Sequence, residues 1–368
     1  MNTFISSKKA RVIAYYLPQF HPIPENDMWW GKGFTEWTNV GKAKPLFKGH
    51  YQPRVPADLG YYDLRNPEIR EAQAKMAFEA GVEGFCYWHY WFGNGKRILE
   101  KPFNAVLESG KPDFPFCLGW ANHSWSNHTW ISDKQWDKKI LIKQEYCGVD
   151  DYKNHFDCVL EAFNDKRYIK IDNKPVFVIY APLALPDSKA FIDLWNELAV
   201  KNGLDGIFFI GICNRINEYE IVLNNGFNAV NSMGHQIAQA RIKGGLYYRF
   251  KKKFNQYLGG MSLQCTDYSD IINSYYSKED RLLNVYPSII PQYDRSPRAG
   301  KYAEIFTNST PALFKKHVSQ ALNIISEKPY EYRILFLRSW NEWAEGNYIE
   351  PDLKYGMQYL DVLKEQLF

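Results

Sequence analysis

Two glutamates near the end of the chain have a spacing that suits carbohydrate chemistry. Glu342 and Glu345 lie in the segment Trp-Asn-Glu-Trp-Ala-Glu-Gly, directly after the apolar run 334–337. Cleavage of a glycosidic bond uses two carboxyl groups: one donates a proton to the departing oxygen, and the other attacks or assists attack at the anomeric carbon. The flanking Trp340 and Trp343 offer an apolar setting that raises the pKa of one of them. We therefore predict that Glu342 and Glu345 are catalytic.

A repeated alternation of strands and helices would bring such residues together. Short apolar runs, separated by helix-like stretches such as 67–80, 150–163, 188–201 and 310–327, are typical of parallel strands joined by crossovers. Asn66-Pro67 and Thr310-Pro311 have the form of helix starts. An open doubly wound sheet usually has a Gly-rich phosphate loop after the first strand, and this chain has none there. The α/β pattern thus predicts a (β/α)8 TIM barrel with strands at 11–17, 84–91, 116–120, 175–180, 207–212, 229–232, 286–293 and 333–340.

The active site of such a barrel lies at the carboxyl ends of the strands. The residues at those ends are polar and aromatic, which suits hydrogen bonds to hydroxyls and stacking on sugar rings. Glu36 and Asp294 have an alternative interpretation as members of ion pairs. The predicted substrate-binding residues are Tyr16, Gln19, His21, Glu36, Trp37, Trp88, His89, Tyr90, Trp120, Asn122, Tyr180, Asn214, Gln292, Tyr293, Asp294, Trp340 and Asn341.

The chain is unusually aromatic, at 17% Phe, Trp and Tyr. Flat apolar faces with a polar edge suit sugar binding, although a large barrel also uses aromatic side chains in its walls. We expect a single catalytic domain over residues 1–368 with two loop insertions, 22–63 and 234–284. The first is predicted to fold over the barrel mouth. The basic run 247–254 fits a solvated helix face, or else a surface for an anionic glycan or membrane lipid.

Several other classes of protein are disfavoured. The histidines lack metal-ligand spacing, and no G-x-S-x-G elbow indicates acyl transfer. A net charge of +4 over 368 residues does not indicate a nucleic-acid partner. The six scattered cysteines fit reduced thiols, and the chain has no long apolar run. Its first nine residues lack the apolar stretch expected of a secretory leader. We expect a cytoplasmic protein without a cofactor, metal or transmembrane segment, with peripheral membrane association left open and no prediction of oligomeric state.

Four motifs carry a resemblance to a known family. They are 14–21 (Ala-Tyr-Tyr-Leu-Pro-Gln-Phe-His), 30–40 (Trp-Gly-Lys-Gly-Phe-Thr-Glu-Trp-Thr-Asn-Val), 52–53 with 58–63, and 340–346 with 350–352. Together they resemble the WbsX-type, glycoside hydrolase family 99-like proteins of bacterial O-antigen and capsule gene clusters. The similarity extends over nearly the whole chain.

The resemblance implies a retaining, endo-acting, α-mannosidase-like enzyme. Glu342 would then be the base that withdraws the proton of the sugar 2-hydroxyl, and Glu345 the general acid and later base. The 2-oxygen would attack the anomeric carbon, and water or another acceptor would open the resulting 1,2-anhydro sugar. The substrate would be an oligosaccharide or polysaccharide.

Two other functions stay open from the sequence. WbsX-type proteins are often labelled glycosyltransferases, so synthesis of O-antigen or capsular polysaccharide is the first alternative. The chain has no D-x-D motif for a metal-bound nucleotide, which weighs against it. The second alternative is a carbohydrate-binding barrel without turnover, and the presence of both Glu342 and Glu345 weighs against that.

Overall fold

The computed structural model describes residues 8–127, 139–244 and 263–368. Eight parallel strands close into a barrel, in the order β1–β2–β3–β7–β8–β9–β11–β13 and back to β1, which confirms the predicted (β/α)8 class. A short strand, β6 (Lys170–Ile171), pairs with β7 in the antiparallel sense. The barrel strands are β1 (Arg11–Tyr16), β2 (Gly84–His89), β3 (Phe116–Trp120), β7 (Lys174–Ile179), β8 (Phe208–Cys213), β9 (Ala229–Ser232), β11 (Val285–Ile289) and β13 (Ile334–Leu337).

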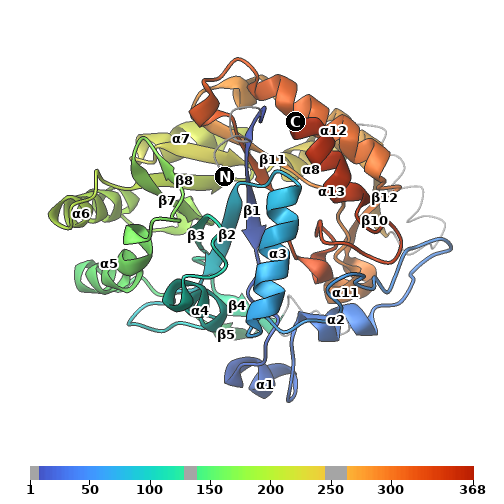
Figure 1. Cartoon of the computed structure of the whole chain (residues 1–368), viewed down its shortest axis with the longest axis horizontal. Coiled ribbons are helices and arrows are strands. Elements are labelled where there is room, and N and C mark those ends of the chain that lie inside the picture. Colours follow the sequence, from blue (N-terminus) through green and yellow to red (C-terminus); the bar gives the residue numbers. More distant parts are fainter. Residues whose placement is uncertain (1–7, 128–138, 245–262) are drawn as a thin grey trace.

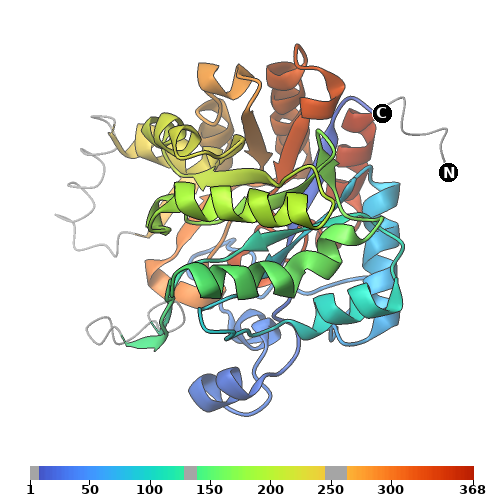
Figure 2. The same cartoon turned by 90° about the vertical axis from the view of Figure 1, so that its left-hand side faces the viewer.

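Helices cover the outside of the barrel (Figure 1). Both predicted helix starts are confirmed: the side chain of Asn66 accepts a hydrogen bond from Glu68 N, and that of Thr310 accepts one from Leu313 N. Figure 2 shows α5 and α6 side by side on the outer wall. The covering helices are α3 (Pro67–Glu79), α4 (Lys101–Ser109), α5 (Val149–Asn164), α6 (Ser188–Lys201), α7 (Tyr219–Asn224), α12 (Pro311–Ile325) and α13 (Gln358–Leu367).

The two predicted loop insertions contain regular structure. The first holds α1 (Pro24–Trp30) and α2 (Glu36–Lys42), and the second holds α8 (Gly234–Gly244), β10 (Gln264–Asp267) and α10 (Tyr268–Asn273). The basic run 247–254 lies outside the described residues. Figure 1 shows α1, α2 and α11 (Ser296–Ala299) gathered at one end of the barrel with the hairpin of β4 (Trp125–Ser126) and β5 (Ile140–Ile142).

Aromatic side chains fill the barrel below this end. The ring of Tyr15 stacks on Trp88, with centroids 4.8 Å apart and planes 1° apart, and also lies 5.2 Å from Phe336. The Tyr15 hydroxyl donates to Asn231 Oδ1 at 2.7 Å. Gly119 on the neighbouring strand leaves room for this layer, because a Cβ there would lie 3.1 Å from the Trp88 ring. The layer is therefore rigid and can serve as the floor of a cavity.

Across the described parts of the chain, no helix has the length and apolar character that crossing a membrane requires.

Candidate active site

A cavity of about 200 Å³ opens above the aromatic floor, at the carboxyl ends of the strands. Glu342 and Glu345 both line it. One part of the wall is aromatic and another is basic, so a sugar ring and a charged group can both be accommodated. The lining residues are Tyr15, Leu17, Gln19, Trp88, Tyr90, Ala121, His123, Ser124, Trp125, Ser126, Tyr180, Met233, Arg295, Arg298, Arg338, Ser339, Glu342 and Glu345.

The segment after β13 is fixed to the barrel at several points. Trp340 N donates to Tyr15 O, and the Asn341 side chain both accepts from Leu17 N (2.8 Å) and donates to Leu17 O (3.0 Å). Glu342 N donates to Ser339 Oγ at 3.1 Å. These bonds tie the loop after β13 to the loop after β1, and they set the height of Glu342 above the floor.

A single short turn places Glu345. Residues Trp343–Glu345 form a 3-10 helix that ends at Gly346, whose φ is +63°. A Cβ at Gly346 would lie 2.9 Å from the backbone and Cβ of Asp294, so this position needs glycine for its space as well as its conformation. Asp294 N also donates to Glu345 O at 2.8 Å. Asp294 is therefore the support behind Glu345.

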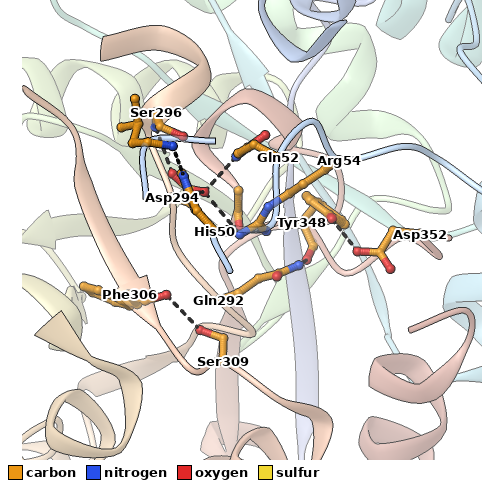
Figure 3. Close-up of polar contacts among 12 residues, drawn as sticks. His50, Gln52, Arg54, Gln292, Asp294, Ser296, Phe306, Ser309, Tyr348 and Asp352 are labelled. Atoms are coloured by element: carbon orange, nitrogen blue, oxygen red, sulfur yellow. Dashed lines mark hydrogen bonds and ion pairs between the residues drawn. The ribbon is translucent and has the colours of Figure 1, made fainter. Parts of the chain in front are cut away.

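Asp294 lies at the centre of the polar network in Figure 3. Its carboxylate accepts hydrogen bonds from His50 Nε2 (2.8 Å), Gln52 Nε2 (2.7 Å) and Ser296 N (2.9 Å). His50 Nδ1 accepts from Leu46 N, so the proton of the neutral ring is on Nε2. Burial opposes ionisation, but the bond from His50 and the charge of Arg54 outweigh it and lower the pKa of Asp294 to about 2. Asp294 is therefore ionised, and its carboxylate oxygens are occupied by these hydrogen bonds.

Arg298 joins the carboxylates of the site. Its Nη1 lies 2.5 Å from Glu345 Oε1, and its Nη2 lies 3.1 Å from Glu342 Oε2 and 2.9 Å from Glu36 Oε1. Glu36 is fully buried behind the cavity wall and comes from α2 in the first insertion. The insertion therefore contributes a charge to the site without lining the cavity.

The two catalytic candidates differ in protonation. Burial raises the pKa of Glu342 to about 7, against the opposing charge of Arg298. Burial also penalises the charge of Glu345, but Arg298, Arg295 and Arg338 outweigh it and lower its pKa to about 2. Below pH 7 the pair therefore holds one proton, on Glu342, while Glu345 carries a charge. Two carboxyl groups whose environments push their pKa values apart are typical of acid and base assignments.

Six predicted site residues line the cavity, from four different strand ends. The carboxylates come from the loop after β13, and the others follow β1, β2 and β7 or lie within them. Tyr90 and Tyr180 lie above Trp88, and the Trp88 and Tyr180 rings meet edge to face at 5.7 Å. The six are Gln19, Trp88, Tyr90, Tyr180, Glu342 and Glu345.

The other predicted residues do not reach the cavity. Tyr16, His89 and Trp120 sit on the outward side of their strands, where they contact Gln73, His155 and Trp91 respectively. His21 and Trp37 bond to backbone oxygens of the segment that follows β1. Asn122 donates to Ala181 O in the loop after β7, and Asn214 is exposed. Gln292 and Asp294 line a second cavity behind Glu345, and Tyr293 packs on Phe306. The residues outside the first cavity are Tyr16, His21, Glu36, Trp37, His89, Trp120, Asn122, Asn214, Gln292, Tyr293, Asp294, Trp340 and Asn341.

The sequence analysis did not predict the basic wall of the cavity, which consists of Arg295, Arg298 and Arg338. Arg295 and Arg298 follow β11 by six or more residues, and Arg338 was counted within the last strand. Arg-Ser-Pro-Arg at 295–298 did offer a signal, because two arginines beside a strand end can meet carboxylates there. Of the described residues, no group of three His, Cys, Asp or Glu could hold a metal ion.

The fold and the cavity define the class: a (β/α)8 barrel with paired carboxylates at the mouth, as in carbohydrate-active enzymes. Two solved structures share this fold at low sequence identity. One is a glycoside hydrolase-like protein (TM-score 0.61, 17% identity, covering 100% of this chain and 96% of that one). The other is the glycoside hydrolase family 99 endo-α-mannosidase from Bacteroides thetaiotaomicron (TM-score 0.59, 14% identity, 97% and 95%).

The chain belongs to the family described as glycosyltransferase WbsX, whose model matches residues 12–363. It is also 33% identical over 371 residues to the uncharacterized protein WxcX of Xanthomonas campestris pv. campestris, covering 97% of this chain. A second strain's WxcX is 32% identical. This chain spans about half the length of these relatives, 50% in each case.

Proposed function

We propose that this chain is a retaining, endo-acting glycoside hydrolase or transglycosidase that uses Glu342 and Glu345 on a bacterial polysaccharide. The observation that carries the proposal is the pairing of Glu342 and Glu345, both held by Arg298 in one cavity with an aromatic floor. The family 99 endo-α-mannosidase, which shares the fold, acts on glycosidic bonds, and this supports the same reaction class here.

The charges favour a division of roles that reverses the one implied by the family resemblance. Glu342 holds the proton and is the group that gives it to the departing glycosidic oxygen as the bond to the anomeric carbon breaks. Glu345, ionised beside three arginines, takes the proton of the 2-hydroxyl while the 2-oxygen attacks the anomeric carbon. The first step leaves a 1,2-anhydro sugar, Glu342 ionised and Glu345 protonated.

The second step restores both groups. Glu342, now a carboxylate, takes a proton from water or from a sugar hydroxyl as that oxygen attacks the anomeric carbon. Glu345 returns its proton to the 2-oxygen as the three-membered ring opens. Two displacements at the same carbon give net retention. Water as the acceptor makes the protein a hydrolase, and a sugar acceptor makes it a transglycosidase.

A second candidate function is glycosyl transfer from an activated sugar, because the matching family is described as a glycosyltransferase. The barrel and the carboxylate pair are compatible with it if the leaving group is a phosphate. Such an enzyme would use the aromatic part of the wall for the sugar and the basic part for the phosphate.

Product analysis by mass spectrometry separates the two. The purified protein is incubated with polysaccharide from its own source, with and without added nucleotide sugars. Shorter oligosaccharides formed without nucleotide sugars support the hydrolase. Growth of an acceptor only when nucleotide sugars are present contradicts the hydrolase and favours transfer.

A further inference from the structure

The cavity has more guanidinium groups than its carboxylates engage closely. Both terminal nitrogens of Arg298 are engaged by Glu36, Glu342 and Glu345. Arg338 and Arg295 face the same space but contact Glu345 only at longer range: Arg338 Nη2 lies 3.8 Å from Glu345 Oε2, and Arg295 Nε lies 3.5 Å from Glu345 Oε1. Neither distance is that of a charge-assisted hydrogen bond.

The remaining contacts of these two groups are weak. Arg338 Nη1 lies 3.0 Å from Met233 Sδ, and a thioether is a weak acceptor. Within the described residues, Arg295 Nε has no hydrogen-bond partner, although the atom is buried. The side chains are 15% exposed for Arg338 and 32% exposed for Arg295, so both groups can be reached from the cavity. Buried charged donors with poor partners are costly unless a ligand completes them.

The charges in the cavity give the sign of that ligand. The lining includes three arginines and two glutamates, so guanidinium groups outnumber carboxyl groups in it. Glu36, behind the wall, is held by Arg298. A guanidinium fork fits the two oxygens of a carboxylate or a phosphate, and a hydroxyl alone does not use its charge.

We infer that the sugar bound in this cavity carries an anionic group, a carboxylate or a phosphate, which Arg338 and Arg295 bind next to Glu345. The inference rests on the proposed function for the identity of the cavity as the sugar site. The aromatic side chains of Trp88, Tyr90 and Tyr180 remain for the ring of the same sugar.

The anionic group has two chemical sources. A uronic acid within a polysaccharide brings a carboxylate on the sugar ring and suits a hydrolase. A glycosyl phosphate or nucleotide sugar brings a phosphate on the anomeric carbon and suits transfer. Both use the same guanidinium groups, so the binding site is common and the preferred anion separates the two.

Isothermal titration calorimetry with matched ligands tests the inference. The probes are uronic acids, the neutral hexoses of the same configuration, hexose 1-phosphates and inorganic phosphate. We expect at least one anionic ligand to bind the wild-type protein about tenfold or more tightly than its neutral counterpart. Tighter binding of the uronic acid points to a glycan substrate, and tighter binding of the hexose 1-phosphate points to an activated donor.

Variants link this preference to the two arginines. Arg338→Gln and Arg295→Gln, alone and together, are expected to abolish the preference for the anion while leaving neutral-sugar binding within about twofold, because the aromatic wall is intact. Arg338→Lys is expected to retain part of it. Arg215→Gln, at an exposed arginine outside the cavity lining, controls for the loss of one positive charge. Melting temperatures without ligand identify any variant that is misfolded.

Two outcomes overturn the inference. One is that no anionic probe binds the wild-type protein more tightly than it binds the double variant. The other is that anionic and neutral sugars bind the wild-type protein equally, in which case the arginines serve only to keep Glu345 ionised. Binding is measured without turnover, so a protein that prefers the anion but does not cleave polysaccharide contradicts the proposed function and leaves this inference standing.

Discussion

At the scale of single residues, the site depends on one guanidinium that three carboxyl groups share. Arg298 contacts Glu36, Glu342 and Glu345 within 3.1 Å. Burial raises the pKa of Glu342 to about 7. Burial also opposes the charge of Glu345, but Arg298, Arg295 and Arg338 outweigh it and lower its pKa to about 2. The difference between the two glutamates therefore comes from their neighbours, since both are glutamates of one short turn.

This arrangement predicts how activity depends on pH. The proton donor must be protonated, so kcat/KM should fall as pH rises through about 7, where Glu342 in the free protein ionises. Glu345 ionises far lower, at about 2, and should not limit activity between pH 4 and 7. A pH profile of kcat/KM checks this. A profile that rises with pH through 7 would instead make Glu342 the base.

The buried Glu36, which does not line the cavity, should affect the pH at which kcat/KM falls. Its negative charge is one of the causes that raise the pKa of Glu342. Glu36→Gln removes that charge, so we expect the alkaline limb of the kcat/KM profile to move to lower pH. Glu350→Gln is the matched control, because Glu350 is buried in the segment after β13 that also holds Glu342. Its carboxyl group accepts hydrogen bonds from Trp343, Gln73 and Tyr62, which do not line the cavity. A limb that moves equally in both variants would contradict a specific role for Glu36.

At the scale of elements, the loops after β1 and β13 behave as one unit. Asn341 makes two hydrogen bonds to the backbone of Leu17 and is fully buried. Asn341→Ala leaves two buried backbone groups without partners, so we expect the free energy of unfolding to fall by about 1–3 kcal/mol. Urea denaturation measures it. Asn323→Ala on the exposed face of α12 is the control. Equal decreases of the free energy of unfolding in the two variants would contradict the role of Asn341 in joining the two loops.

The turn at Gly346 gives a second test with a matched pair. Gly346 and Gly356 both have positive φ, +63° and +51°, but a Cβ meets Asp294 only at Gly346 and meets nothing within 4 Å at Gly356. Gly356→Ala should cost about 1–2 kcal/mol for the left-handed conformation alone. Gly346→Ala should cost more and should also lower activity, since it displaces the support of Glu345. Comparable melting temperatures for the two variants would exclude a steric role for Asp294.

The positions of the strands could be predicted from the sequence more closely than the directions of their side chains. The runs 116–120 and 229–232 match β3 and β9 residue for residue, because short apolar runs between helix signals are a strong strand pattern. The direction of each side chain was harder to assign. Tyr15 points into the barrel and its neighbour Tyr16 points out to Gln73, and a pattern of buried residues on both faces does not distinguish them.

The basic wall could not be predicted for a different reason. Arg295 and Arg298 lie in a segment between β11 and β12 (Glu304–Thr307), and their direction depends on the fold of that segment and on contacts with Glu36 from the first insertion. Glu36 and Arg298 are 262 residues apart in sequence. Nothing local in either segment indicates such a pair, whereas Glu342 and Glu345 could be predicted because both belong to one turn after one strand.

At the scale of the whole molecule, this chain holds every strand of the barrel and both walls of the cavity. The relatives from Xanthomonas are about twice as long, with this chain covering 50% of each. The carboxylates, the aromatic floor and the three arginines all come from the described part of this chain. We therefore expect the chemistry proposed for Glu342 and Glu345 to be measurable on this chain alone.

The most direct measurement is the rate of glycan turnover by the wild-type protein and by Glu342→Gln, Glu345→Gln and Glu350→Gln, each confirmed as folded by its melting temperature. We predict that each of the first two substitutions lowers kcat by about 10²–10⁴-fold, as expected for loss of a general acid or base, while Glu350→Gln retains activity in its folded fraction. Activity unchanged in either Glu342→Gln or Glu345→Gln would contradict the central claim that this pair carries the reaction.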